Sequence, residues 1–152
     1  MTHTLALTLT ALLGAAPTGA FKLSVLDDKP IKIVKGDDEE RQLLKERYNV
    51  SLSGLQARIK LYQVSPDVSA ASVFDAAQRT LAAELDLCTT PAERVTVREK
   101  QLEVARELER MHKDLYEAGR VSRADMELAV YHRIDAQLQL LRAKKAAEAK
   151  PK

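Results

Sequence analysis

The feature that most constrains the fold is a run of apolar residues that recur at alternating spacings of four and three. It is clearest between residues 91 and 118, where the recurring positions span three heptads. These positions are Val97, Gln101, Val104, Leu108, Met111, Leu115 and Ala118. Such a spacing places side chains on one stripe of a helix and is typical of helices that pack side by side along a narrow seam. The pattern therefore predicts a long helix with one buried stripe and charged outer positions.

The same spacing recurs upstream. The repeated positions there are Tyr48, Leu52, Leu55, Ile59 and Tyr62. Pro66 lacks a backbone N–H and disfavours helical geometry at Ser65, which predicts that this helix ends near Val64. Asp67 or Ser69 is then the expected N-cap of the next helix.

A second helix is predicted over residues 70–88, followed by a strong start signal for a third. The buried side of the second helix is expected to carry Val73, Phe74, Ala77, Leu81, Leu85 and Cys88. Thr90 is then expected to be an N-cap, with Pro91 at the first helical position and Glu93 closing a capping box. A new helix must therefore begin at this point.

A glycine-centred break separates the third helix from a fourth. Gly119 is placed as the C-terminal cap, because a left-handed backbone conformation costs little for glycine. Ser122, with Asp125 three residues later, is the expected start of the last helix. The buried side of that helix is predicted to carry Leu128, Tyr131, Ile134, Leu138 and Leu141. Residues 149–152 lack apolar anchors and are expected to fray.

The composition agrees with long, narrow helices. Aromatic residues make up 4% of the chain, Trp is absent, and Gly and Pro number five each. The 24 basic and 22 acidic side chains nearly balance, which favours solvated helix faces over a dedicated anion-binding surface. We therefore predict an all-α fold of two tandem long antiparallel helical hairpins, residues 39–88 and 89–148, that pack as a four-helix coiled-coil-like bundle.

The first twenty residues have the composition of an export signal. Residues 5–16 form an apolar run too short to cross a bilayer, and the small residues at 18–20 suit a cleavage site before Phe21. We expect residues 1–20 to be a signal peptide and the protein to be extracytoplasmic, either periplasmic or secreted. No later segment has the roughly 18 apolar residues of a membrane helix. Residues 21–38 alternate apolar and polar residues, which fits either a short two-stranded hairpin or an extended linker arm.

The chain also contains an internal repeat with an offset of about 53 residues. At this offset the loop at 65–69 falls on the loop at 118–122. Downstream, Leu81, Ala83, Leu85 and Leu87 fall on Ile134, Ala136, Leu138 and Leu140. Upstream, Leu61 and Tyr62 match Leu115 and Tyr116 with one residue of slippage. We interpret the chain as two related helical hairpins.

The second copy carries a recognisable motif. Tyr116, Gly119, Ser122 and Asp125, with an apolar and alanine spacing that continues to Leu141, resemble the helical repeat of TolC-type outer-membrane efflux proteins. In that family a Tyr-x-x-Gly-x-x-Ser-x-x-Asp segment joins two helices of a long periplasmic coil. The chain is also similar to short extracytoplasmic proteins of planctomycete type that carry doubled helical hairpins.

The first copy keeps only part of that motif. Tyr62 and Ser69 remain, whereas Ser65 or Pro66 stands at the glycine position and no acidic residue follows Ser69 at the matching place. The resemblance covers about residues 39–148. It implies long antiparallel helices and, as a function, contact with other components of an envelope assembly.

Groups that could carry chemistry are sparse. Glu109 and His112 have the Glu-x-x-His spacing of di-iron bundles, but such sites need two of these pairs and two further glutamates. His132 has Ala129 where a glutamate would be required. Cys88 has no histidine near it in sequence to activate it. We therefore predict no catalytic, cofactor-binding or metal-binding residue, with a metal-binding helical bundle as the remote alternative.

The leading functional hypothesis is a non-enzymatic extracytoplasmic helical scaffold or protein-interaction module. We expect its helical seams to bind a protein partner or a second copy in a homo-oligomer, and we expect no nucleic acid as a ligand and no transmembrane span. The alternative is an accessory component of an envelope efflux or transport assembly, which would give the protein an association with the envelope.

Overall fold

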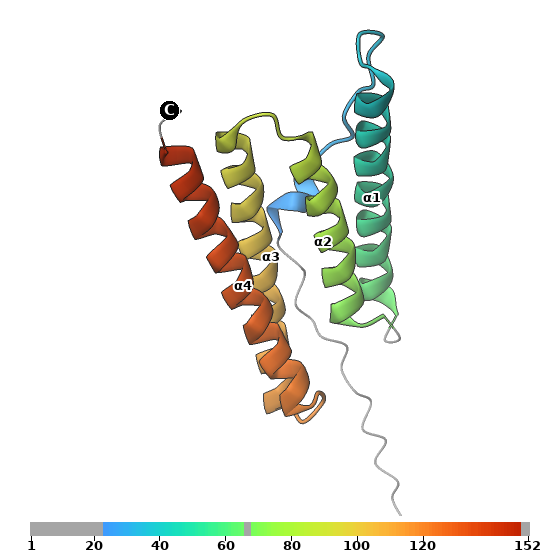
Figure 1. Ribbon diagram of the computed structural model, residues 1–152. Helices are drawn as coiled ribbons and strands as arrows, with labels where there is room; N and C mark the ends of the chain where they lie inside the picture. Colours follow the sequence, from blue (N-terminus) through green and yellow to red (C-terminus); the bar gives the residue numbers. More distant parts are fainter. Residues whose placement is uncertain (1–22, 66–67, 150–152) are drawn as a thin grey trace, which may run out of the picture.

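The computed structural model describes residues 23–65 and 68–149 and consists of helices joined by short loops (Figure 1). A short 3₁₀ helix, η1, is followed by four α-helices. The bounds are η1 Ser24–Asp27, α1 Glu39–Val64, α2 Ala70–Leu87, α3 Pro91–Glu117 and α4 Arg123–Glu148. The predicted signal peptide, its cleavage site before Phe21, the loop residues Pro66 and Asp67 and the last three residues of the predicted tail lie outside the described residues.

The four α-helices stand in a row, each antiparallel to its neighbours (Figure 1). α1 packs on α2 and α3 packs on α4, while contacts between α2 and α3 join the two pairs. No strand forms within residues 23–65 and 68–149. The prediction of an all-α fold built from two helical hairpins is therefore confirmed. Within the same ranges, no helix is both long and apolar enough to cross a membrane.

Side-chain caps explain where all four α-helices begin, and the cap of α2 is Ser69. The Asp38 carboxylate accepts a hydrogen bond from the Arg41 N–H at 2.7 Å at the start of α1. At the start of α3 the Thr90 hydroxyl accepts from the Glu93 N–H, and the Glu93 carboxylate accepts from the Thr90 N–H. Ser122 begins α4 with a capping box of the same kind. Each such cap stabilises a helix by about 1 kcal/mol, and the sequence alone locates the last two.

Gly119 follows the end of α3 and has a left-handed backbone conformation, with φ of 67°. Its N–H donates to the Tyr116 carbonyl at 2.9 Å, and the Arg120 N–H donates to the Leu115 carbonyl at 2.8 Å. These two bonds satisfy carbonyls that the helix end leaves free and form a Schellman motif. The chain can therefore reverse direction within a few residues and start α4 alongside α3.

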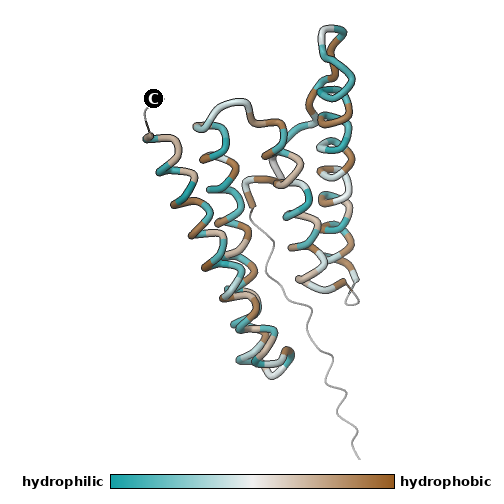
Figure 2. Tube along the Cα trace, viewed as in Figure 1, coloured by the Kyte–Doolittle hydropathy of each residue, from teal (hydrophilic) through white to brown (hydrophobic). Residues whose placement is uncertain are grey.

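The core lies between the helices, and α2 and α3 contribute most to it because each has a neighbour on both sides. One face of α2 turns toward α1, where Ala83 and Leu87 cluster with Tyr48 and Leu52. The other face joins a larger core that extends into α3 and α4. Apolar and hydrophilic residues alternate along every helix (Figure 2), as partial burial of each helix requires.

The prediction for the buried face of α4 is wrong. Leu128, Tyr131, Ile134, Leu138 and Leu141 were expected to be buried, yet each is 42–61% exposed. The buried side of α4 consists instead of Ala129, Ala136 and Leu140. α4 lies at the edge of the row and packs mainly on α3, and small residues let two helices approach closely. The larger stripe is therefore left on the outer side.

The segment before α1 is neither a two-stranded hairpin nor an unattached linker. Leu23 and Val25 are buried, Val25 completely, and both belong to the main core. Ser24 of η1 hydrogen-bonds through its N–H and its hydroxyl to the Glu103 carboxylate of α3. We call residues 23–38 the N-terminal arm. The arm runs from η1, between the two hairpins, to the start of α1 (Figure 1).

Candidate functional site

An exposed apolar stripe on α4 is the most prominent surface feature of the second hairpin. We define the α4 stripe as Tyr131, Ile134, Leu138 and Leu141, all large hydrophobic residues with exposed side chains. Ile134 and Leu138 stand two residues before and after the buried Ala136. At about 100° per residue they lie about 160° from it around the helix axis. The α4 stripe therefore points away from α3, out of the row.

α1, at the other edge of the row, has an equivalent stripe. Its exposed large residues are Leu43, Val50, Leu61 and Val64, with exposed fractions of 51–80%, and the exposed Gly54 and Ala57 complete the heptad spacing. We call these six residues the α1 stripe. Val50 stands two residues before the buried Leu52, so it lies on the side of α1 opposite that residue. Both ends of the row are thus apolar.

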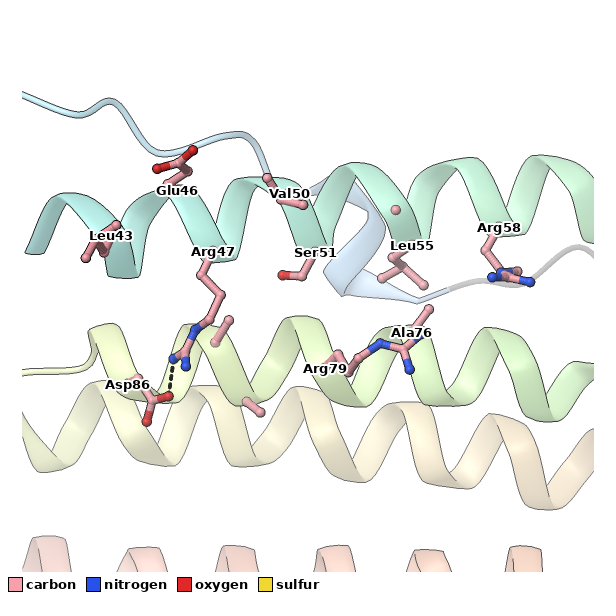
Figure 3. Close-up of a pocket in the computed structure, with 13 residues that line it drawn as sticks. Leu43, Glu46, Arg47, Val50, Ser51, Leu55, Arg58, Ala76, Arg79 and Asp86 are labelled. Carbon is pink, nitrogen blue, oxygen red and sulfur yellow. Dashed lines mark hydrogen bonds and ion pairs between the residues drawn. The ribbon is translucent and has the colours of Figure 1, made fainter. Parts of the chain in front are cut away.

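A groove of about 750 Å³ lies between α1 and α2 (Figure 3), and Leu43, Val50 and Gly54 of the α1 stripe form part of its lining. Its floor is mainly aliphatic and includes Leu55, Ala76 and Ala83. Arg47 of α1 reaches across the groove to form an ion pair with Asp86 of α2. The groove widens the apolar surface on this edge of the molecule and gives it a charged border.

A partly buried ion-pair cluster joins the two hairpins and the N-terminal arm. Lys100 Nζ of α3 donates to Asp28 Oδ2 of the arm at 2.6 Å and to Glu84 Oε1 of α2 at 2.8 Å. The Tyr48 hydroxyl of α1 lies 3.4 Å from Asp28 Oδ2. One ammonium group thus holds together three parts of the chain that are distant in sequence.

The electrostatics of this cluster favour a structural role. Burial lowers the pKa of Lys100, but hydrogen bonds from its ammonium to Asp28 and Glu84 outweigh burial and raise that pKa above its ordinary value. Burial, with the nearby Asp28 and Glu84 carboxylates, raises the pKa of Tyr48. A lysine that acts as a base or nucleophile needs the opposite change, toward neutrality. The cluster therefore favours the charged form of Lys100.

The motif residues singled out in the sequence lie at helix ends and do not converge on one site. Ser69, Thr90 and Ser122 are the N-caps of α2, α3 and α4. Pro91 and Glu93 belong to the first turn of α3. The remaining four, Tyr62, Tyr116, Gly119 and Asp125, lie near the α1–α2 and α3–α4 connections, which are at the same end of the helices (Figure 1). Together they shape turns.

The groups considered for metal binding or nucleophilic chemistry all have other contacts. Glu109 accepts a hydrogen bond from Arg133 at 2.8 Å, and His112 Nδ1 lies 3.0 Å from the Leu108 carbonyl oxygen. The His132 ring packs at a tilt of 45° against Phe74, with ring centroids 4.8 Å apart. Among the described residues no group of three or more His, Cys, Asp or Glu side chains could hold a metal ion.

Cys88 is also placed unfavourably for nucleophilic chemistry. It is the C-cap of α2, and its Sγ lies 3.3 Å from the Glu84 carbonyl oxygen. Burial raises the pKa of its thiol, whereas a nucleophilic cysteine needs a lowered pKa.

The sequence did not predict that the α1 stripe and the α4 stripe are exposed. For the α4 stripe, the internal repeat is the signal that could have predicted it. At the 53-residue offset, Ala76, Ala83 and Leu87 of α2 fall on Ala129, Ala136 and Leu140 of α4, and all six are buried. This match identifies the alanine side of α4 as the side within the hairpin and leaves the α4 stripe for another contact.

The fold defines a class of protein: an open row of two antiparallel helical hairpins with an apolar face at each edge. Comparison of the chain with protein-family models, curated proteins and solved structures finds no match. Function therefore has to be inferred from the surfaces that this molecule presents.

Proposed function

We propose that the protein is a non-enzymatic helical interaction module that binds other protein helices through the outer faces of its edge helices. The observation that carries this proposal is the α4 stripe. Four large hydrophobic side chains there, Tyr131, Ile134, Leu138 and Leu141, follow one side of a 26-residue helix and are exposed. Contiguous apolar surface of this kind on a folded chain marks an interaction site.

The apolar area of the α4 stripe determines how tightly a partner helix can bind to it. Burying the exposed half of each of these four large side chains is worth about 1 kcal/mol, so the α4 stripe offers about 4 kcal/mol before the cost of association is subtracted. A helix that packs along α4 alone would therefore bind weakly. Tight binding would need the α1 stripe or the α1–α2 groove as well.

The setting that we propose is extracytoplasmic. It is supported by the apolar segment at residues 1–20 and by the resemblance of the Tyr116-to-Asp125 motif to TolC-type helical repeats. N-terminal sequencing of the protein recovered from the host cell, together with cell fractionation, tests this setting. A mature chain that begins at Phe21 outside the cytoplasm is expected, and an unprocessed cytoplasmic chain would refute it.

The interaction itself is tested by photocrosslinking in the host cell. A photoreactive amino acid at position 138, on the α4 stripe, is expected to give a discrete protein adduct. The matched control carries the same amino acid at position 106, because Arg106 is an exposed residue of α3 outside both stripes. Equal labelling at the two positions, or no adduct at position 138, would contradict the proposal.

A second candidate is an accessory role in an envelope transport assembly, with docking against a TolC-type coil. The observation that favours it is the exposed tip of the second hairpin, where Tyr116, Gly119, Ser122 and Asp125 all face solvent. Tyr116→Ala is expected to abolish co-purification with an envelope efflux protein, whereas Leu138→Ala is not. If Leu138→Ala abolished the co-purification and Tyr116→Ala did not, docking through the tip would be excluded.

A further inference from the structure

Two arginines line the α1–α2 groove from opposite walls, near the tip of the first hairpin. Arg58 belongs to α1 and Arg79 to α2, and both guanidinium groups lie toward the same end of the groove (Figure 3). Both residues are exposed, and within the part of the chain that the structure describes neither forms an ion pair. A guanidinium group binds a carboxylate through two parallel hydrogen bonds. This end of the groove therefore suits an acidic ligand.

The described chain supplies no carboxylate to these two arginines. All acidic residues of α1 lie at or before Glu46, which stands about three turns before Arg58. On α2, Asp75 is one turn before Arg79, but it lines a separate cavity between α2, α3 and α4. Charges are therefore separated along this hairpin, although they nearly balance in the chain as a whole. The cationic end of the groove is complementary to acidic groups from another molecule.

The shape of the groove fits a helix better than a small molecule. From Leu43 to Arg58 its α1 wall extends over about 22 Å, at 1.5 Å per residue. Its floor does not continue into the protein, because Leu55, Ala76 and Ala83 are only 0–6% exposed. A ligand in the groove thus stays open to solvent along its length. A small-molecule site encloses most of its ligand, whereas a groove between two helices accepts the apolar face of a third helix.

The middle of the groove has room for large side chains. It is lined there by the small residues Gly54, Ala82 and Ala83, and a Cβ added at Gly54 would meet no atom within 4 Å. Leu43 and Val50 of the α1 stripe add exposed apolar surface to the α1 wall. Gly54, which weakens an isolated helix, thereby keeps the groove open. A complementary helix carries leucine-sized side chains on one face.

We propose that the α1–α2 groove binds an amphipathic helix of another protein, which places leucine-sized side chains in the groove and acidic side chains between Arg58 and Arg79. This inference rests on the proposed function and specifies the chemistry of the partner at the α1 edge. The acidic side chains determine which helix binds. A helix with neutral or basic side chains at that place would cover two guanidinium groups without pairing them, which costs affinity.

Synthetic peptides serve as probes of this contact. The acidic peptide has about 20 residues and is roughly 30 Å long as a helix. It carries leucines at spacings of three and four and two glutamates, one turn apart, near one end. Two matched peptides have glutamine or lysine in place of both glutamates. Fluorescence anisotropy of the dye-labelled peptides gives the dissociation constant of each peptide for the purified protein.

Three variants of the purified protein locate the contact. The double variant Arg58→Glu with Arg79→Glu reverses the charge at the end of the groove. Gly54→Leu fills the middle of the groove, and the open space around Gly54 lets the fold accept the side chain. Arg106→Glu is the matched control, because Arg106 is an exposed arginine of α3 that does not line the groove. Circular dichroism checks that each variant is folded.

The acidic peptide is expected to bind the wild type and Arg106→Glu equally, and at least about tenfold more tightly than the glutamine or lysine peptide does. The double variant is expected to prefer the lysine peptide to the acidic one, which reverses the preference of the wild type. Gly54→Leu is expected to bind the acidic peptide at least about tenfold more weakly than the wild type, while its melting temperature does not fall.

Several results would overturn the inference. They are a wild type that binds no peptide or binds all three alike, a double variant with the wild-type preference, and a folded Gly54→Leu chain with undiminished affinity. Sedimentation velocity tests the other occupant: self-association of the wild type that Gly54→Leu abolishes would identify a second copy in the groove instead. A wild type that binds no peptide, together with a discrete adduct at position 138 in the host cell, would overturn this inference alone and leave the proposed function standing.

Discussion

At the scale of single residues, two glycines illustrate opposite uses of the same residue type. Gly119 adopts a φ of 67°, in the left-handed region where a side chain is strained. Gly54 lies inside α1 with ordinary helical geometry and open space around it. The first is required by the turn, whereas the second weakens the helix that contains it.

Substitutions at the two glycines are therefore expected to have opposite effects on stability. Gly119→Val is expected to destabilise the fold by about 1 kcal/mol or more, because the left-handed conformation disfavours a β-branched side chain. Gly54→Ala is expected to stabilise it by up to about 1 kcal/mol. Thermal unfolding of the dilute monomer followed by circular dichroism measures both. An unchanged melting temperature for Gly119→Val would show that α3 ends elsewhere.

The cluster around Lys100 predicts how stability depends on pH. The folded-state pKa values of Tyr48 and Lys100 lie above their ordinary values of 10.0 and 10.5. A group with a raised pKa stabilises the folded state fully below its unfolded pKa and loses that effect as the pH rises through the folded pKa. Stability should therefore fall above about pH 10. The free energy of unfolding of Tyr48→Phe, measured with urea across this pH range, should fall less steeply with pH than that of the wild type. The same pH dependence in both proteins would exclude the role given to Tyr48.

At the scale of elements, the sequence predicts the helix ends well because the signals are local. The capping boxes that begin α3 and α4 each depend on residues within a single turn. The buried stripe of α1 was also predicted, because Tyr48, Leu52 and Leu55 form one seam. Which face of α4 is buried depends on its neighbour instead. Both of its stripes have helical spacing, so the local pattern does not decide between them.

A pair of substitutions on α4 distinguishes its two faces by stability. Ala136→Leu adds three carbon atoms where α4 packs closely on α3 and is expected to cost about 1–3 kcal/mol by overpacking. Leu138→Ala removes the same number from an exposed side chain and is expected to change stability by less than about 0.5 kcal/mol. Urea unfolding of dilute protein measures both. The reverse order of effects would mean that the larger stripe is the buried one.

At the scale of the whole molecule, the N-terminal arm holds the two hairpins together. Its residues Leu23 and Val25 fill space in the core, and Asp28 accepts a hydrogen bond from Lys100. The sequence did not reveal this role, because an alternating apolar pattern over a short segment fits a strand, a linker or a packed arm equally well. Its partners on α3 are more than seventy residues away, beyond the reach of any local pattern.

Weakening the arm is therefore expected to weaken the junction between the hairpins. Val25→Ala removes two methyl groups from a fully buried position and should cost about 2 kcal/mol. Ile33→Ala, on the exposed part of the same arm, should cost less than about 0.5 kcal/mol. Amide hydrogen exchange is expected to rise most in α2 and α3 at their shared face. If hydrogen exchange rose equally in all four helices, the arm would not be what holds the two hairpins together.

The bond between Ser24 and Glu103 also constrains the order of events during folding. It joins residues 79 positions apart, whereas each hairpin closes through a loop of only a few residues. Local contacts form fast, and contacts between distant parts of a chain form late because closing a long loop costs entropy. Each hairpin can thus assemble early, while the arm, which is synthesised before both hairpins, has no docking site until α3 exists. The first described segment of the chain is therefore among the last to reach its place.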